Sequence, residues 1–158
     1  MSVLDVHEKL FDVVAAADLL FWPIALDTKY HDVENMPDNF IDLTLFNGAV
    51  RNSENEHMAK LLRAKSKILV AYGSCAHMGG IPGLANFSTR DDILQRVFVE
   101  SESVTNSDRI LPLSETEIKE GTLNIPEFYN DVRSLSQVVK VDYFIPGCPP
   151  QTERFVEV

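Results

Sequence analysis

Apolar residues recur along this chain in two alternating patterns, which predict strands separated by helices. Four short apolar runs are typical of buried strands: 18–24, 41–46, 67–72 and 138–145. Helical spacing of apolar residues marks other segments, most clearly 3–17 and 53–62. Strands that alternate with helices predict an α/β fold, in which a doubly wound parallel sheet is covered by helices on both faces.

Local signals mark where these helices begin. Ser53 and Glu56 match a capping box, and Thr89 stands before a short helix. Pro149-Pro150 precedes a final helix, 151–158. Each of the last three predicted strands is therefore followed by a helix, as βα units require.

The ends of the chain depart from this regular order. The chain opens on a helix with no strand before it and closes inside another helix. In a flavodoxin-like order, 2-1-3-4, the strand before the first helix lies in the middle of the sheet. We therefore expect residues 1–158 to form a single flavodoxin-like domain that is truncated at both ends and lacks its first, central strand. The facing edges of 18–24 and 67–72 would then be unpaired.

The middle of the chain also departs from the pattern. Between residues 99 and 136 the sequence consists of Ser, Glu, Thr and Asn with scattered Leu and Ile. This predicts a long irregular insertion within the domain. Segments of this kind are more often functional or bound to a partner than merely structural.

Composition narrows the classes of partner and compartment. The 158 residues carry a net charge of -10, which argues against a nucleic-acid backbone or an anionic membrane surface as partner. No apolar run approaches the roughly 18 residues of a membrane span, and the N-terminus has no basic region followed by an apolar one. Two cysteines do not make a disulfide framework, so we expect a reducing, cytoplasmic setting.

The two cysteines are the candidate chemistry, since each follows a predicted strand and is surrounded by glycine and proline. Thiolates at the carboxyl ends of parallel strands suit an iron–sulfur cluster, and Cys75 and Cys148 are the candidate metal ligands. Five neighbours would let the backbone approach the cluster closely: Gly73, Ser74, Gly79, Gly80 and Gly147. Two thiolates are too few to hold a cubane cluster alone.

Other interpretations of these residues stay open. Both cysteines could be buried structural thiols, because free cysteine is among the most buried residue types. The glycine-rich loop after Cys75 could cradle a phosphate, although it has neither the P-loop lysine nor G-x-G-x-x-G spacing. His77 could be a cluster ligand or proton carrier, or a turn histidine bonded to the backbone or lying at a subunit contact.

Two motifs surround the cysteines: Gly73-Ser74-Cys75-Ala76 with Gly79-Gly80-Ile81-Pro82-Gly83, and Pro146-Gly147-Cys148-Pro149-Pro150. Together with Asn47-Gly48-Ala49-Val50-Arg51 they resemble the small subunit of nickel–iron hydrogenases. The resemblance is strongest to the cytoplasmic methanogen type, which does not reduce coenzyme F420 and works with heterodisulfide reductase. It extends over nearly the whole chain and is weakest after Val99.

This resemblance implies an electron-transfer subunit of an oxidoreductase, not catalytic on its own. It would relay electrons from H2 oxidation through a proximal 4Fe-4S cluster, docked against the nickel-bearing large subunit, towards an iron–sulfur or flavin partner such as heterodisulfide reductase. In the family four thiolates hold that cluster. Two of them map onto Cys75 and Cys148, and the other two, a C-x-x-C pair, would lie just before Met1.

Two alternatives accompany this hypothesis. The small subunit of respiratory NADH dehydrogenases also carries the two cysteine turns, and it would face a quinone site. A cluster-free flavodoxin-like module, acting in assembly or interaction, would account for the two absent thiolates.

Overall fold

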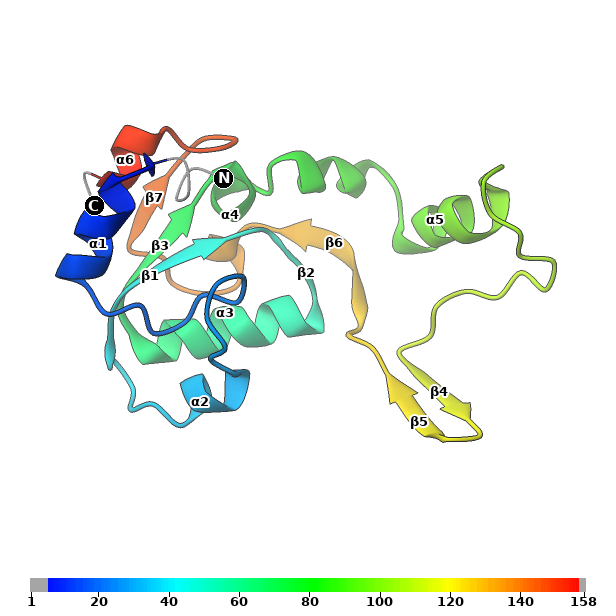
Figure 1. Cartoon of the computed structure of the whole chain (residues 1–158). Helices are drawn as coiled ribbons and strands as arrows, with labels where there is room; N and C mark the ends of the chain where they lie inside the picture. Colours follow the sequence, from blue (N-terminus) through cyan, green and yellow to red (C-terminus); the bar gives the residue numbers. More distant parts are fainter. Residues whose placement is uncertain (1–5, 157–158) are drawn as a thin grey trace.

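A three-stranded parallel sheet organises the protein, whose computed structural model describes residues 6–156. Its strands are β1 (Ile41–Asn47), β3 (Ser66–Tyr72) and β7 (Tyr143–Ile145), in the order β1-β3-β7 (Figure 1). Two pairs fix the register, Leu43 with Ile68 and Val70 with Tyr143. The predicted α/β class with a parallel sheet is confirmed. Of the apolar run 138–145, only the last three residues form strand.

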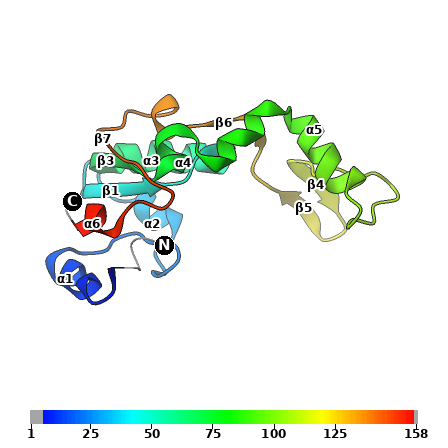
Figure 2. The ribbon, with the colours of Figure 1, turned by 90° about the horizontal axis from the view of Figure 1, so that it is seen from above.

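Alternate residues of β3 face opposite sides of the sheet, as the two-residue period of a strand requires. Leu69 and Ala71 pack in one fully buried cluster with Ala59 of helix α3 (Ser53–Lys65). Val70 and Tyr72 pack in another, against which Phe155 of helix α6 (Thr152–Val156) lies. Helices therefore cover both faces of the sheet, as a doubly wound fold predicts (Figure 2).

The helix α3 begins one residue earlier than its sequence signal indicated. Asn52 is the N-cap residue, and its side-chain oxygen accepts a hydrogen bond of 2.8 Å from the backbone N–H of Asn55. The capping box predicted for Ser53 and Glu56 is wrong. Asn52 has the extended backbone of a cap, whereas Ser53 is already helical and accepts a bond from the backbone N–H of Glu127. Thr89 does cap its helix, as predicted.

An ion pair fastens α3 to the sheet. The Arg63 guanidinium contacts the Asp142 carboxylate just before β7, and the same carboxylate accepts a 2.9 Å bond from the backbone N–H of Leu69. The Leu69 amide, with Arg63, holds the pKa of Asp142 below its usual value. The ionised carboxylate therefore ties three elements together: α3, β3 and β7.

The apolar run 18–24 is not a strand, and that prediction is wrong. Leu20 and Phe21 instead pack from an irregular segment onto a cluster that contains Val33 and Met58. No strand among residues 6–156 lies beside this segment to accept its backbone hydrogen bonds, and packing alone does not make a strand. The helix predicted for 3–17 forms over α1 (Lys9–Ala16), and residues 3–5 of it lie outside the described range.

The prediction that strand 67–72 has an unpaired edge is also wrong. β3 is the middle strand of the sheet, paired with β1 on one side and β7 on the other. The free edges among the described strands belong to β1 and β7.

Regular structure occupies much of the segment expected to be irregular. Within 99–136 lie the antiparallel hairpin of β4 (Glu115–Ile118) and β5 (Gly121–Asn124), then β6 (Phe128–Arg133). β6 pairs with β2 (Val50–Asn52), so the segment returns to the body of the protein. The hairpin itself projects away from that body (Figures 1 and 2). The prediction failed because the hairpin strands bury no side chain, and so they lack a strong apolar pattern.

Short helices complete the molecule. They are α2 (Tyr30–Glu34), α4 (Ser74–Met78), η2 (Ile81–Phe87), α5 (Arg90–Gln95), η3 (Arg96–Glu100) and η4 (Leu135–Gln137). The predicted final helix forms as α6, and residues 157–158 lie outside the described range. Within residues 6–156, none of these helices is long and apolar enough to cross a membrane.

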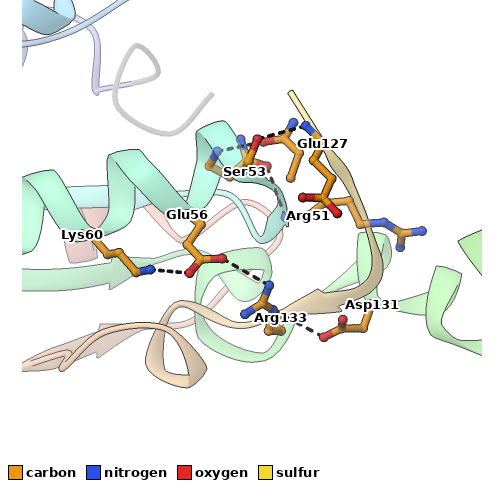
Figure 3. A network of polar contacts seen from close by, with 9 residues as sticks. Arg51, Ser53, Glu56, Lys60, Glu127, Asp131 and Arg133 are labelled. Carbon is orange, nitrogen blue, oxygen red and sulfur yellow. Dashed lines mark hydrogen bonds and ion pairs between the residues drawn. The ribbon is translucent and has the colours of Figure 1, made fainter. Parts of the chain in front are cut away.

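Polar contacts fix β6 against α3 (Figure 3). Glu56 contacts Lys60 on its own helix and the Arg133 guanidinium at 3.4 Å. The Lys60 and Tyr129 hydrogen bonds lower the pKa of Glu56. Arg133 also lies over the Tyr129 ring, 4.8 Å from its centroid. Glu56 therefore joins the helix to β6 through two neighbouring side chains of the strand.

Candidate functional site

Both cysteine turns lie at one edge of the sheet, where β3 and β7 end. Three hydrogen bonds join the turns directly. Gly73 N–H donates to Ile145 O at 2.7 Å, Ser74 N–H donates to Gly147 O at 2.7 Å, and Gly147 N–H donates to Ser74 Oγ at 3.2 Å. The structure thus brings together the two loops that carry Cys75 and Cys148.

The first turn places Cys75 in the opening turn of α4. The peptide N–H of His77 donates to Gly73 O and that of Gly79 to Cys75 O, both at 3.0 Å. Gly80 has φ +53, and a Cβ on it would lie 2.9 Å from Cys75 Sγ. Only glycine therefore leaves the half-buried thiol its present space.

The second turn is tighter still. Gly147 has φ +134, and a Cβ there would lie 2.4 Å from Pro150 Cα and 2.7 Å from Pro149 O. Pro150 is buried beneath the turn, whereas Cys148 is exposed. The peptide bond between Cys148 and Pro149 is cis. In this turn the Cys148 thiol is therefore exposed, while the backbone around Gly147 and Pro150 is closely packed.

The chemistry of the two thiols suits ligation better than catalysis. Both cysteines are free, and over residues 6–156 no hydrogen bond joins either thiol to a histidine or carboxylate that would act as a base. No group of three or more Cys, His, Asp or Glu side chains in that range is arranged to hold a metal ion. Within the described residues the candidate ligands are thus two thiols, fewer than the four thiolates that a 4Fe-4S cluster takes.

The His77 side chain lies beside this edge without a hydrogen bond to it. Its ring is tilted over Phe144, with the ring centroids 4.8 Å apart. Its Nδ1 is buried and makes no hydrogen bond to any described residue. The two functional roles considered for His77, as cluster ligand or as proton carrier, stay predictions.

The sequence motif around Arg51 gave no sign of an unusual environment for that side chain. All three guanidinium nitrogens are buried and have no hydrogen-bond partner in the described part of the chain. The group lies over the Phe128 ring, 4.4 Å from its centroid. Burial lowers the pKa of Arg51, and the nearby Asp131 carboxylate opposes that shift. The positions of Phe128 and Asp131 depend on the pairing of β6 with β2, which the sequence did not indicate.

Exposed apolar side chains follow the first cysteine turn along the chain. Met78 follows Cys75 closely, and Ile81, Leu84 and Phe87 lie on η2, with between 61% and 89% of each side chain exposed. A contiguous set of large exposed apolar residues is typical of an interaction surface. The surface directly follows the Cys75 turn along the chain.

Comparison with known proteins gives the family. The family model described as "NADH ubiquinone oxidoreductase, 20 Kd subunit" matches residues 1–158. The chain belongs to this family. Within the family, it is 42% identical over 159 residues to the iron–sulfur subunit of the F420-non-reducing hydrogenase of Archaeoglobus profundus. That match covers 100% of this chain and 50% of the relative.

Two further comparisons agree with this placement in the 20 Kd subunit family. The corresponding subunit of the F420-non-reducing hydrogenase of Methanothermobacter marburgensis is 34% identical, with 100% of this chain and 47% of the relative covered. A crystal structure of an NAD+-reducing [NiFe]-hydrogenase superposes with a TM-score of 0.80 at 27% identity, over 99% of this chain and 78% of that chain. The resemblance to hydrogenase small subunits is confirmed. The chain spans about half the length of the curated relatives it matches.

Proposed function

We propose that this chain is part of the electron-transferring small subunit of a cytoplasmic nickel–iron hydrogenase. It relays electrons released by H2 oxidation through a proximal 4Fe-4S cluster. The observation that carries the proposal is the hydrogen-bonded pair of cysteine turns at one edge of the sheet. The hydrogenase relatives support the choice of reaction.

In this proposal Cys75 and Cys148 supply two thiolates, and the other two come from outside the described residues. When bound, the cluster accepts and passes on one electron at a time. Other residues of this chain shape the two turns and hold them together. Gly73, Gly80 and Gly147 allow backbone atoms to approach closely, and the Ser74–Gly147 hydrogen bonds hold the two thiols on one edge. Gly79 ends α4 so that the loop turns back over Cys75.

The exposed apolar residues of η2 are the proposed contact for the nickel-bearing large subunit. In this proposal that subunit makes and breaks the bonds to hydrogen, and this chain passes on the electrons. Covering the edge would also exclude water from Cys75, whose surroundings then set the cluster potential. A second partner, of the iron–sulfur or flavin type exemplified by heterodisulfide reductase, takes the electrons onward.

The test uses the complete native protein, co-produced anaerobically with its large subunit. Cys75→Ala and Cys148→Ala are each expected to lower the iron and sulfide content and to remove the electron paramagnetic resonance signal of the reduced cluster. Ser88→Ala, which changes an exposed side chain outside both turns, is the control and should keep the wild-type content. A double alanine variant with a full complement of iron would contradict the proposal.

One observation favours a second candidate, a cluster-free interaction module. The described residues supply only two thiols, and they contain no group of three ligating side chains. A complete native protein that stays free of iron after anaerobic reconstitution, yet still binds a partner subunit, would favour this candidate.

A third candidate is the small subunit of a respiratory NADH dehydrogenase, because the family description names such a subunit. A stable complex with a quinone-reducing rather than a nickel-bearing subunit would identify it.

A further inference from the structure

Residues 96–126 form an arm that has no core of its own. The arm consists of η3, a connecting loop and the β4–β5 hairpin, and Figures 1 and 2 show it extending away from the sheet and its helices. None of its side chains is buried, and none belongs to the three hydrophobic clusters of the described chain. Eight of its large apolar residues are 37% to 67% exposed: Val97, Phe98, Val104, Ile110, Leu113, Ile118, Leu123 and Ile125. So many exposed apolar side chains on one projection indicate a surface that a partner covers.

The charge of the arm indicates what kind of partner. It contains six carboxylates and three cationic side chains. Four of the carboxylates, those of Glu102, Asp108, Glu115 and Glu120, make no hydrogen bond or ion pair with any described residue. They are therefore available to basic groups on another molecule. A second copy of this chain is a poor occupant, because its own arm is acidic and its net charge is -10.

One part of the arm combines exposed apolar side chains with carboxylates. A hollow of about 670 Å³ lies over residues 96–104, lined by Val97 and Val104 together with Arg96, Glu100 and Glu102. Glu100 is paired with Arg96, whereas the Glu102 carboxylate is unpaired among the described residues. Lysine and arginine side chains have an apolar stem and a cationic head, and they bury the stem while the head finds a charge or water. The valines suit such a stem, and the unpaired Glu102 carboxylate suits its head.

The base of the arm is tied to the cysteine edge. The Asn86 side chain on η2 bonds Val132 of β6 in both directions, donating to its carbonyl at 2.9 Å and accepting from its N–H at 2.7 Å. Asn130 of β6 accepts a 2.9 Å bond from the backbone N–H of Arg90 at the start of α5. Both ends of the arm therefore meet η2 and α5, next to the exposed apolar surface that follows Cys75.

We infer that the arm clasps the same subunit that covers the cysteine edge, through an apolar patch on that subunit surrounded by lysine and arginine side chains. This inference rests on the proposed function, which places the nickel-bearing large subunit over η2. The exposed apolar side chains of η2 lead along the chain to those of the arm. One partner can therefore contact both surfaces. The arm then supplies charge complementarity and orientation, while η2 supplies the contact nearest the thiols.

The experiment compares two sets of charge reversals in the complete native protein. The arm variant carries Glu102→Lys, Glu115→Lys and Glu120→Lys, which break no internal contact among the described residues. The control carries the same change in charge on the far side of the molecule, as Glu8→Lys, Asp12→Lys and Asp18→Lys, all exposed (Figure 1). The dissociation constant for the large subunit is measured at low and high salt.

We expect the arm variant to bind the large subunit at least about tenfold more weakly at low salt, and to lose most of the salt dependence of binding. The control should stay within about threefold of the wild type. Hydrogen exchange on the wild-type complex should show protection of the amides of β4 and β5. Wild-type affinity and salt dependence in the arm variant, or an unprotected hairpin in the complex, would overturn the inference and leave the proposed function standing.

The two proposals fail in different ways. If the wild-type protein does not bind the large subunit, the partner named here is wrong, and the iron content of the same sample decides separately whether the electron-transfer role survives. Circular dichroism of the arm variant shows whether the fold is intact. A folded variant that has lost the partner while keeping its iron supports the inference.

Discussion

Replacing Gly147 by alanine tests whether the tight second turn holds the two cysteines together. Gly147 has φ +134, and the added Cβ would lie 2.4 Å from Pro150 Cα and 2.7 Å from Pro150 N. These are backbone atoms, which cannot move aside as a flexible side chain would. The turn must therefore shift, and with it the two hydrogen bonds between Gly147 and Ser74.

Gly48→Ala is the matched control. Gly48 also has a positive φ, +104, but nothing lies within 4 Å of the position of its Cβ. Backbone strain of about 1–3 kcal/mol applies to both variants and largely cancels between them. Overpacking adds about 1–3 kcal/mol at Gly147 alone, and each weakened hydrogen bond adds about 1 kcal/mol. We expect the Gly147 variant to have a free energy of unfolding about 3–5 kcal/mol below that of the control.

Equilibrium denaturation by urea measures this difference, provided that both variants keep the wild-type dependence on denaturant concentration. Iron content after anaerobic reconstitution is measured in parallel, and we expect it to fall for Gly147→Ala and to be kept by Gly48→Ala. Equal unfolding free energies for the two variants would refute the reasoning. That result would mean that the prolines yield and that the turn is not a rigid support for Cys148.

Three further predictions concern the sheet and the base of the arm. Leu69→Ala should lower the free energy of unfolding by about 2–5 kcal/mol, because Leu69 is fully buried, while Leu123→Ala on the exposed hairpin should cost less than about 0.5 kcal/mol. Asp142 has a lowered pKa in the native state, so its contribution to stability is present above its unfolded pKa of about 3.9 and is lost as the pH falls through the native value. The stability gap between wild type and Asp142→Asn, followed by denaturation at several pH values, should therefore shrink below about pH 4; a constant gap would contradict the assignment. Glu56→Gln should speed hydrogen exchange of the β6 amides around Arg133 and leave β3 unchanged, and uniform changes in both strands would argue against a local role.

The parts of the fold that the sequence predicted are those with a complete local signal. The strand 67–72 is flanked on both sides and covered on both faces, so all its residues from Leu69 onward are buried and its apolar run is continuous. Thr89 caps its helix through its own side chain and that of Asp92, three residues away, so the sequence contains the whole motif. The cysteine turns were predictable for the same reason.

The failures share a different cause, which is dependence on a partner segment. The run 18–24 has the apolar composition of a strand, but a strand also needs a neighbour, and none of the described strands lies beside it. β6 could not be predicted because its partner, β2, lies far away along the chain and consists of three residues only. Likewise, Asn52 displaced Ser53 as the cap because Ser53 bonds to Glu127, a residue whose position depends on β6.

The cysteine turns are tightly bonded within the chain, and the arm is not. This difference matches the roles proposed for them, electron transfer at the turns and partner binding at the arm. At the cysteine edge the ends of all three strands are fastened to one another. Asn47 at the end of β1 donates to Tyr72 O at 3.1 Å, and Gly73 N–H donates to Ile145 O. An electron-transfer centre needs fixed ligands, since displaced thiolates alter both cluster binding and potential. The arm has exposed apolar groups and no buried side chain, so it gains its ordering contacts only when a partner supplies them. The cysteine turns are thus held by hydrogen bonds within this chain, whereas the arm depends on a partner to cover its apolar side chains.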